Sequence, residues 1–246
     1  MPYEQISSPR DIQAAYRGSA TASGYVEGRF ASELMRLMHD KQVAAVNRAM
    51  KLHRPLRSLE IAPGPGRITR EVITSGSLTC LEFNDGMIEV GRPECSPHVT
   101  WVQGDAFALP FQEEFELAYT FRFVRHFKID DRARLYAQVR KVLRPGGVLL
   151  FDVVNEKVSA PLRKSSPEEY PVYDEIYANI DAVARELKAH GLLLVSALPV
   201  LRCFSLQRSV QLLVGPRWRR LCRSLIRGME WWPGGPLEWI VECRRE

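Results

Sequence analysis

The sequence predicts a single α/β domain in which helices flank a mainly parallel sheet. From position 57 onward, short apolar runs alternate with amphipathic segments, as in successive strand–helix–strand units. The chain has 246 residues, and 46% of them are hydrophobic, which suffices for the core of one such domain. We therefore expect one domain over residues 1–246. It comprises an N-terminal helical cap (1–54), a strand-rich core (56–154) and a C-terminal part with helical insertions (155–246).

The elements follow from local patterns. Residues 31–50 carry apolar side chains at helical spacing and predict a helix that packs over the rest of the chain. Strands are predicted at 58–62, 78–83, 99–105, 115–121, 146–154, 192–204 and 237–245. Helical segments are predicted at 68–76, 86–92, 130–143 and 173–191. We expect Asp130 or Asp131 to cap the third of these, the sequence RPGG (144–147) to separate it from the next strand, and Gly191 to end the fourth.

Cysteine spacing and hydropathy exclude several classes of protein. The five cysteines are an odd number without the spacing of zinc ligands, so we expect reduced thiols, no disulfide framework and no metal site. The longest apolar run, residues 191–201, is well short of the roughly 20 residues that cross a membrane. The N-terminus lacks a basic region followed by an apolar one. These features predict a cytoplasmic protein without a membrane span.

The positive charge of the chain is concentrated in one segment. The net charge is +5, yet residues 201–228 contain seven arginines and no acidic residue. The remainder of the chain is slightly acidic. Any anionic partner should therefore bind at this segment rather than across the whole surface.

The sequence EIAPGPGR (60–67) connects the first predicted strand to the following segment. Gly64 and Gly66 allow a sharp turn that presents backbone N–H groups and no side chains, so a ligand can approach the main chain. Parallel sheets bind ligands at the carboxyl ends of their strands. Glu82 ends the second strand, where a carboxylate accepts ribose hydroxyls, and Asp105 ends the third, within reach of an exocyclic amine. The alternative for the glycines is an ordinary tight turn.

Two nucleotide-binding motifs are absent. No G-x-G-x-x-G fingerprint and no Gly-Lys-Ser/Thr sequence occurs in the chain. The turn instead resembles the first motif of the class I S-adenosylmethionine-dependent methyltransferases, acidic-x-G-x-G-x-G, and reads Glu60-Ile-Ala62-Pro-Gly64-Pro-Gly66. Ala62 replaces the first glycine of the family motif. The resemblance continues through Glu82, Asp105 and the sequence LRPGGVLLFDV (143–153), and it covers residues 56–154.

This resemblance implies a Rossmann-like fold with an antiparallel last strand and a helical cap. It implies S-adenosyl-L-methionine as cofactor, S-adenosyl-L-homocysteine as product, and methyl transfer to a small-molecule acceptor of aromatic or apolar character. The cofactor-binding residues that it implies are Arg29, Glu60, Ala62, Pro63, Gly64, Glu82, Phe83, Met87, Asp105, Ala106 and Phe121. Two alternatives stay open. One is an RNA or protein methyltransferase that docks through residues 202–227, and the other is a non-catalytic module that binds the cofactor.

Three further residues have a functional and a structural interpretation. If a helical turn follows the fourth strand, Arg122 and His126 share a face, and His126 is the candidate general base. A histidine held by a structural partner is the alternative. In related enzymes the segment before the sheet closes over the cofactor, so Arg29 is a candidate partner of its carboxylate and Tyr25 a neighbour of its sulfonium. An exposed loop is the alternative there.

The arginine-rich segment places Trp218, Leu221, Leu225 and Ile226 at helical spacing. A membrane-surface helix, an RNA-binding face and a helix packed over the substrate site all fit this pattern. Because the segment lies between two predicted strands, we favour a packed insertion whose apolar face contacts the protein itself and whose arginines form a solvated rim. Nucleic acid is then not an expected partner. Tyr170, Tyr173 and Tyr177 line a substrate pocket or belong to the core.

Overall fold

Seven strands of the described residues form one sheet with the order β3-β2-β1-β4-β5-β7-β6. The structure is a computed structural model that describes residues 32–165, 177 and 179–246. Its strands are β1 (Arg57–Ile61), β2 (Ser77–Glu82), β3 (Val99–Gln103), β4 (Phe115–Thr120), β5 (Leu143–Val154), β6 (Leu192–Val200) and β7 (Glu238–Arg245). β1 to β5 pair in parallel, whereas β7 pairs antiparallel with both β5 and β6. The predicted mainly parallel sheet with an antiparallel last strand is confirmed.

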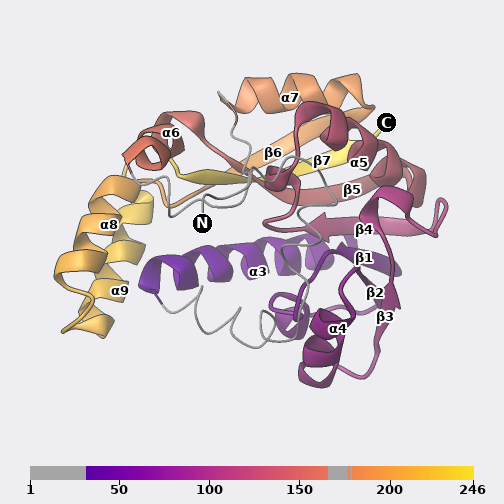
Figure 1. The fold of residues 1–246 in the computed structure, drawn as a ribbon, viewed down its shortest axis with the longest axis horizontal. Coiled ribbons are helices and arrows are strands. Elements are labelled where there is room, and N and C mark those ends of the chain that lie inside the picture. Colours follow the sequence, from indigo (N-terminus) through magenta and orange to yellow (C-terminus); the bar gives the residue numbers. More distant parts are fainter. Residues whose placement is uncertain (1–31, 166–176, 178) are drawn as a thin grey trace, which may run out of the picture.

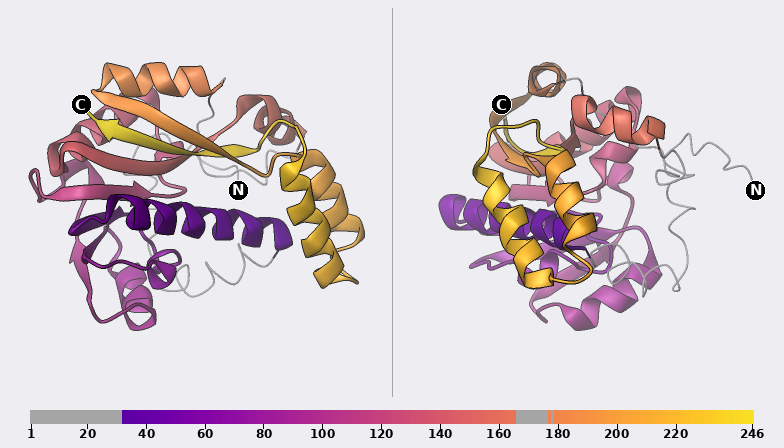
Figure 2. Two further views of the ribbon diagram at one scale, coloured as in Figure 1. Left: turned by 180° about the vertical axis from the view of Figure 1, so that it is seen from behind. Right: turned by 90° about the vertical axis from the view of Figure 1, so that its left-hand side faces the viewer.

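Helices cover both faces of this sheet (Figure 1). On one face lies α3 (Glu33–His53), and on the other lie α5 (Ile129–Val142) and α7 (Ile180–Ala189), as the reverse view also shows (Figure 2). Each face has its own hydrophobic core. The core under α3 includes Met38, Val46 and Met50, and the core under α5 includes Leu135 and Val139.

The N-terminal helix α3 is one layer of the fold. It starts where Ser32 accepts a hydrogen bond from the backbone N–H of Met35 at 3.2 Å. The helix predicted over 68–76 is absent, and a single 3₁₀ turn, η1 (Thr69–Glu71), takes its place. The Asn47 side chain of α3 accepts from the N–H of Ile73 at 2.8 Å and donates to the carbonyl of Glu71 at 3.0 Å. These bonds hold the segment extended, so the prediction there was wrong.

Two further boundaries differ from the sequence prediction. α5 begins one residue earlier than expected, because Lys128 is its N-terminal cap residue and Asp130 and Asp131 lie in its first turn. The RPGG sequence is no break between helix and strand, since β5 follows α5 directly. Its pairing with β4 shifts register around Phe115, and Gly146 has φ +76°. Leu143 pairs with Phe115 and Val148 with Leu117, so residues 144–147 form an irregularity in this pairing, where glycine accommodates the positive φ.

α4 and α7 lie within predicted helical segments, but α7 is shorter than the predicted 173–191, β6 ends at Val200 rather than at 204, and α6 was not predicted. Asn84 caps α4 (Asp85–Gly91), and Asn179 caps α7 through hydrogen bonds to backbone N–H groups. Gly191, with φ +68°, ends α7 as predicted. α6 (Glu156–Ser165) follows β5.

No helix of the described part of the chain is long and apolar enough to cross a membrane.

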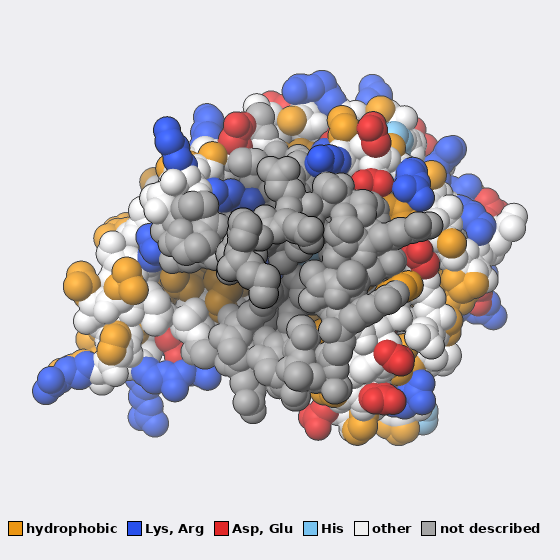
Figure 3. All heavy atoms as spheres, in the orientation of Figure 1, with side chains coloured by type: hydrophobic (Ala, Val, Ile, Leu, Met, Phe, Trp, Pro, Cys, Tyr) orange, Lys and Arg blue, Asp and Glu red, His pale blue; other side chains and the backbone are white. Residues whose placement is uncertain are grey.

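The arginine-rich segment folds as a hairpin of two helices, α8 (Phe204–Leu213) and α9 (Arg219–Gly228), between β6 and β7. Lys and Arg side chains project from the lower left of the molecule, at the end of this hairpin (Figure 3). The expected packing is only half right. Ile226 is fully buried, but Trp218, Leu221 and Leu225 are 58%, 46% and 40% exposed.

The arginines of α9 are not simply a solvated rim. Arg223 donates to Glu33 at 2.7 Å, and Arg219 lies 3.3 Å from the same carboxylate. Arg227 pairs with Asp40. Residues 219, 223 and 227 share one stripe of α9 because they are spaced by four, and this stripe faces α3. Hydrogen bonding to Arg223 lowers the pKa of Glu33.

Candidate functional site

One cavity opens at the carboxyl ends of β1, β2 and β4, where the strand order reverses. It encloses about 1070 Å³, part of it open to solvent. Ten of the eleven residues predicted to bind the cofactor line it, together with His126: Glu60, Ala62, Pro63, Gly64, Glu82, Phe83, Met87, Asp105, Ala106 and Phe121. The eleventh, Arg29, lies outside the described residues, as do Tyr25, Tyr170 and Tyr173.

The turn after β1 has a left-handed backbone at three alternate positions. Ala62, Gly64 and Gly66 have φ values of +53°, +59° and +69°. A Cβ on Gly66 would lie 2.6 Å from the Cys95 sulfur, so this glycine is required for packing. A Cβ on Gly64 would meet nothing within 4 Å. Gly64 therefore keeps open space at the cavity wall, whereas Ala62 adopts a backbone conformation that costs an ordinary residue about 1–2 kcal/mol.

Glu82 lies between this turn and the start of α4. Its Oε2 accepts from the N–H of Gly64 at 2.9 Å, and its Oε1 accepts from the N–H of Asn84 at 3.0 Å. Burial raises the pKa of Glu82, although the backbone hydrogen bonds oppose this shift. Each carboxylate oxygen has two lone pairs, so both retain capacity to accept from a ligand in the cavity.

Asp105 lies two residues beyond the end of β3, whose last residue, Gln103, pairs with Glu82 of β2. Its Oδ1 accepts from the N–H of Phe107 at 2.9 Å and thereby starts the 3₁₀ turn η3 (Ala106–Ala108). No other partner of this carboxylate occurs among the described residues. The second oxygen is therefore available to a donor in the cavity, in line with the proposed contact to an exocyclic amine.

Glu60 belongs to a buried polar cluster beneath the cavity. The hydroxyls of Thr69 and Tyr119 donate to its Oε2 at 2.6 and 2.9 Å, and the Cys80 sulfur lies 3.8 Å from the same atom. Burial raises the pKa of Glu60 to about 7, although both hydrogen bonds act in the opposite direction. Glu60 Oε2 thus accepts hydrogen bonds from buried side chains of the protein itself. Glu60 therefore has a structural role that the sequence did not indicate.

His126 and Arg122 both border the cavity, but not through a shared helical face. His126 ends the 3₁₀ turn η4 (Val124–His126), and Arg122 precedes that turn with φ +59°. The condition for a shared face, a helical turn over 122–126, is therefore not met, because the 3₁₀ turn covers only Val124–His126. The backbone N–H of Arg122 donates to Asp152 Oδ1 at 2.6 Å, which stabilises the left-handed conformation.

A buried ion cluster lies behind this loop and was not predicted. Arg125 Nη1 lies 3.1 Å from Glu238 and 3.5 Å from Asp152, and both carboxylates are completely buried. Asp152 and Glu238 come from neighbouring strands, β5 and β7. An aspartate inside the apolar run LLFDVV is the one signal by which the sequence could have indicated this cluster.

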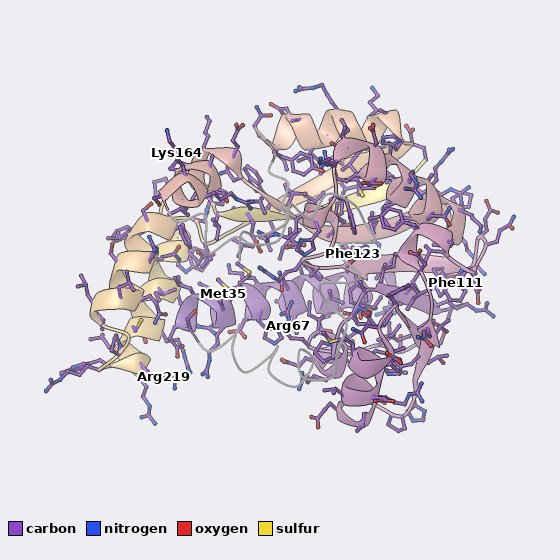
Figure 4. All side chains as sticks on the ribbon, in the orientation of Figure 1. Met35, Arg67, Phe111, Phe123, Lys164 and Arg219 are labelled. Carbon is purple, nitrogen blue, oxygen red and sulfur yellow. The ribbon has the colours of Figure 1, made fainter. Side chains whose placement is uncertain are left out.

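Aromatic rings form the other wall of the cavity. Phe107 and Phe123 each pack edge-on against Phe127, with ring centroids 5.0 and 4.9 Å apart, and all three residues line the cavity beside His126. Phe123 is labelled near the centre of the molecule in Figure 4. Sequence reasoning identified Phe83 and Phe121 but missed these three, because their spacing matches no motif.

A second cation, Arg67, borders the cavity from the side of α3. Its Nη2 donates to Gln42 Oε1 at 2.8 Å, and its Nη1 contacts His39. Figure 4 shows Arg67 beside α3. Arg67 and Arg122 are therefore the cations that border the cavity in the described part of the chain, and the sequence analysis had assigned Arg67 no role.

Tyr177 does not line the cavity. It is 5% exposed, and its hydroxyl lies 3.0 Å from Glu186 and 3.3 Å from the hydroxyl of Tyr136. This tyrosine belongs to the core between α5 and α7, which was one of its two interpretations.

All five cysteines are free thiols, and no group of three potential metal ligands occurs among the described residues.

The comparisons with known proteins agree with this geometry. Residues 59–147 match the family model described as "Methyltransferase domain". The ubiquinone/menaquinone biosynthesis C-methyltransferase UbiE of Proteus mirabilis is 30% identical over 145 residues, which are 52% of this chain and 57% of that protein. The chain thus spans just over half the length of this curated relative.

Two solved structures share the fold. Magnesium protoporphyrin IX methyltransferase from Synechocystis, with bound S-adenosylhomocysteine, superposes with a TM-score of 0.69 at 9% identity and covers 97% of this chain and 100% of its own. N-methyltransferase NodS from Bradyrhizobium japonicum, also with S-adenosylhomocysteine, gives a TM-score of 0.56 at 15% identity and covers 86% and 87%. Both likenesses concern the fold.

Proposed function

We propose that this chain, which carries a class I S-adenosylmethionine-dependent methyltransferase domain, transfers a methyl group from that cofactor to a small-molecule acceptor of aromatic or apolar character. One observation carries the proposal. A single cavity combines a glycine turn and two carboxylates at strand ends with a wall of phenylalanine rings and a histidine. The first set suits a nucleoside cofactor, and the second suits an apolar acceptor with an ionisable group.

The residues at the strand ends fit the cofactor part by part. We assign Glu82 to the ribose hydroxyls, Asp105 to the exocyclic amine of adenine, and the open backbone at Gly64 to the methionine moiety. Bound S-adenosylmethionine supplies an electrophilic methyl group on a sulfonium. The chain itself contributes position, since it holds both partners in one cavity and so converts an encounter in solution into a local reaction.

The acceptor side consists of the phenylalanine cluster and His126. Rings that pack edge-on leave flat apolar surfaces against which an aromatic acceptor can stack. We assign His126 the role of general base, which removes the proton of an acceptor hydroxyl, amine or acidic carbon as the methyl group transfers. The apolar wall also excludes water from the reacting atoms.

The buried ion cluster supports this arrangement from behind. Asp152 accepts from the N–H of Arg122, and Arg125 joins the same loop to Asp152 and Glu238. The loop that carries Arg122 and His126 is therefore fixed to strands β5 and β7. We interpret Asp152 and Arg125 as positioning residues. Removing either partner of such a buried pair would leave the other charge unpaired, at a cost of about 3–5 kcal/mol.

Turnover is the direct test. The protein is incubated with S-adenosylmethionine and a panel of hydroxylated aromatic compounds, including a quinol, and the S-adenosylhomocysteine formed is measured. Formation that depends on a panel compound supports the proposal. Tight cofactor binding without turnover on any small molecule, RNA or protein would favour the non-catalytic alternative. Methylation of RNA or protein alone would favour the macromolecular one.

Three further expectations complete the proposal. We place the protein in the cytoplasm, an assignment supported by five free thiols, which are typical of a reducing compartment. We also retain the organisation as a single domain, although no described residue after 154 lines the cavity. Arg29 stays a proposed partner of the cofactor carboxylate.

A further inference from the structure

The α8–α9 hairpin exposes a group of large apolar side chains that nothing in the described chain covers. We call this group the hairpin patch; its members are Leu206, Leu212, Leu213, Trp218, Leu221 and Leu225. Leu213 is 83% exposed and Leu212 is 63% exposed. Single exposed leucines are common on soluble proteins, but six large exposed apolar side chains on one short hairpin indicate a surface that binds something.

The most exposed members lie at the tip of the hairpin. α8 ends at Leu213 and α9 begins at Arg219, so Leu212, Leu213, Trp218 and Leu221 surround the connecting loop. The hairpin is joined to the sheet at its other end, through β6 and β7. In Figures 1 and 2 its loop points away from the sheet. The tip is therefore a projection from the domain and lies apart from the cavity.

Arginine side chains without a carboxylate partner among the described residues lie beside the same tip. Arg219, Arg223 and Arg227 pair with carboxylates of α3. Arg208, Arg217 and Arg220, in contrast, have no carboxylate partner among the described residues. Arg217 and Arg220 are exposed on either side of Trp218. Residues 212–221 thus combine apolar and cationic side chains and contain no acidic residue.

We propose that the tip of the α8–α9 hairpin binds the surface of a lipid bilayer that contains anionic lipids. Leucine and tryptophan side chains enter the boundary between headgroups and acyl chains, and the flanking arginines pair with lipid phosphates. Tryptophan favours this boundary because its ring is apolar and its N–H is polar. The contact is peripheral, in keeping with the absence of a spanning helix from the described residues.

The composition and shape of the tip favour a bilayer over two other partners. RNA binding relies on phosphate contacts along an extended groove and on aromatic stacking, whereas five of the six patch residues are leucines and three arginines are held by α3. A second copy of the chain would need a broad, flat, self-complementary surface. A narrow projecting tip offers little area for such an interface but inserts readily between lipid headgroups.

Sedimentation with vesicles tests the proposal. We expect the full chain to bind vesicles of phosphatidylcholine and phosphatidylglycerol (3:1) at low salt, to bind pure phosphatidylcholine more weakly, and to dissociate as salt rises. The double variant Arg217→Gln/Arg220→Gln should bind the anionic vesicles roughly twentyfold more weakly, since each arginine at such a surface contributes a factor of about five. The variant Leu213→Ser/Trp218→Ser should also lose binding.

The control carries the same types of change at the far side of the molecule. Ile73 is 78% exposed, and Arg92 is exposed after α4, so Ile73→Ser/Arg92→Gln alters an apolar and a cationic side chain away from the hairpin. It should bind like the wild type. All changed positions are exposed, and thermal melts verify that each variant folds.

Three results would overturn the proposal. The first is vesicle binding that is absent, or equal in the tip and control variants. The second is binding of a single-stranded RNA oligonucleotide that exceeds vesicle binding and is lost in Arg217→Gln/Arg220→Gln. The third is a dimer in sedimentation equilibrium that Leu213→Ser/Trp218→Ser converts to a monomer. None of these results depends on methyl transfer, so they are separate from the test of the proposed reaction.

Discussion

The carboxylate of Glu82 accepts a hydrogen bond from the backbone N–H of Gly64 at 2.9 Å. This bond joins the end of β2 to the turn after β1. A ligand that binds in the cavity therefore meets the glycine turn and the carboxylate as one rigid unit.

The first prediction concerns this carboxylate. Glu82→Ala should weaken binding of S-adenosylhomocysteine by about 1.5–3 kcal/mol, the range for a hydrogen bond to a charged group. Isothermal titration calorimetry measures the change, and the exposed Glu89→Gln on α4 serves as control. Unchanged affinity would remove Glu82 from the site, and tight binding of NAD in place of the sulfonium cofactor would contradict the assignment of the cavity.

The second prediction separates backbone strain from ligand contact. Gly64 and Gly146 both have a left-handed backbone, and a Cβ on either would meet nothing within 4 Å. Gly64→Ala and Gly146→Ala should therefore each reduce the free energy of unfolding by roughly 1 kcal/mol. Only Gly64→Ala places its methyl group where the cofactor approaches, so only this variant should lose affinity for S-adenosylhomocysteine. Equal affinities in the two variants would show that Gly64 does not contact the ligand.

The third prediction is a pH dependence of stability. The pKa of Glu60 is raised from 4.5 to about 7, so the folded state prefers the protonated carboxyl. Its contribution to stability is present below pH 4.5 and is lost as the pH rises through 7. Glutamine still accepts from Thr69 and Tyr119 but does not ionise. Glu60→Gln should therefore flatten the stability profile between pH 5 and 8 and raise the free energy of unfolding at pH 8 by on the order of 3 kcal/mol.

Urea denaturation at several pH values measures this effect, with Glu89→Gln as an exposed control. If the wild type and Glu60→Gln have parallel profiles, Glu60 ionises in the folded state as it does in the unfolded chain. That result would contradict a pKa of Glu60 raised to about 7 in the folded state.

The fourth prediction tests the general base. Once an acceptor is known, His126→Ala should lower the rate of methyl transfer about 100-fold or more, whereas the affinity for S-adenosylhomocysteine should stay the same. The exposed His98→Ala is the matched control. Single-turnover kinetics measures the rate. A fully active His126→Ala would return this histidine to a structural role and leave positioning as the main source of catalysis.

The strands and the site at their ends were predictable because both depend on local patterns. Apolar runs indicate buried strands, and in a parallel sheet the residues that follow those strands meet at one edge. Glu82, Asp105 and the glycine turn could therefore be brought together without a structure. The missing helix after β1 was not predictable, since its cause is Asn47, a residue of α3 that lies 26 positions from Ile73.

Contacts between distant residues account for what the sequence did not reveal at the site. Arg125 and Glu238 are 113 positions apart, and the pattern around neither residue indicates the other. Phe107, Phe123 and Phe127 converge from two different turns. The exposure of Leu213 and Trp218 likewise depends on how the hairpin packs, because a helical pattern identifies an apolar face but not what covers it.

The 21-residue helix α3 connects two regions that have so far been treated separately. Near its start, Glu33 and Asp40 hold α9 through Arg219, Arg223 and Arg227. On the same helix, His39 and Gln42 lie on either side of Asp40 in the sequence and contact Arg67 at the wall of the cavity. α3 is one continuous α-helix with a rise of about 1.5 Å per residue. It therefore connects the hairpin mechanically to this wall of the cavity. Any displacement of α9 that carries α3 with it also moves Arg67.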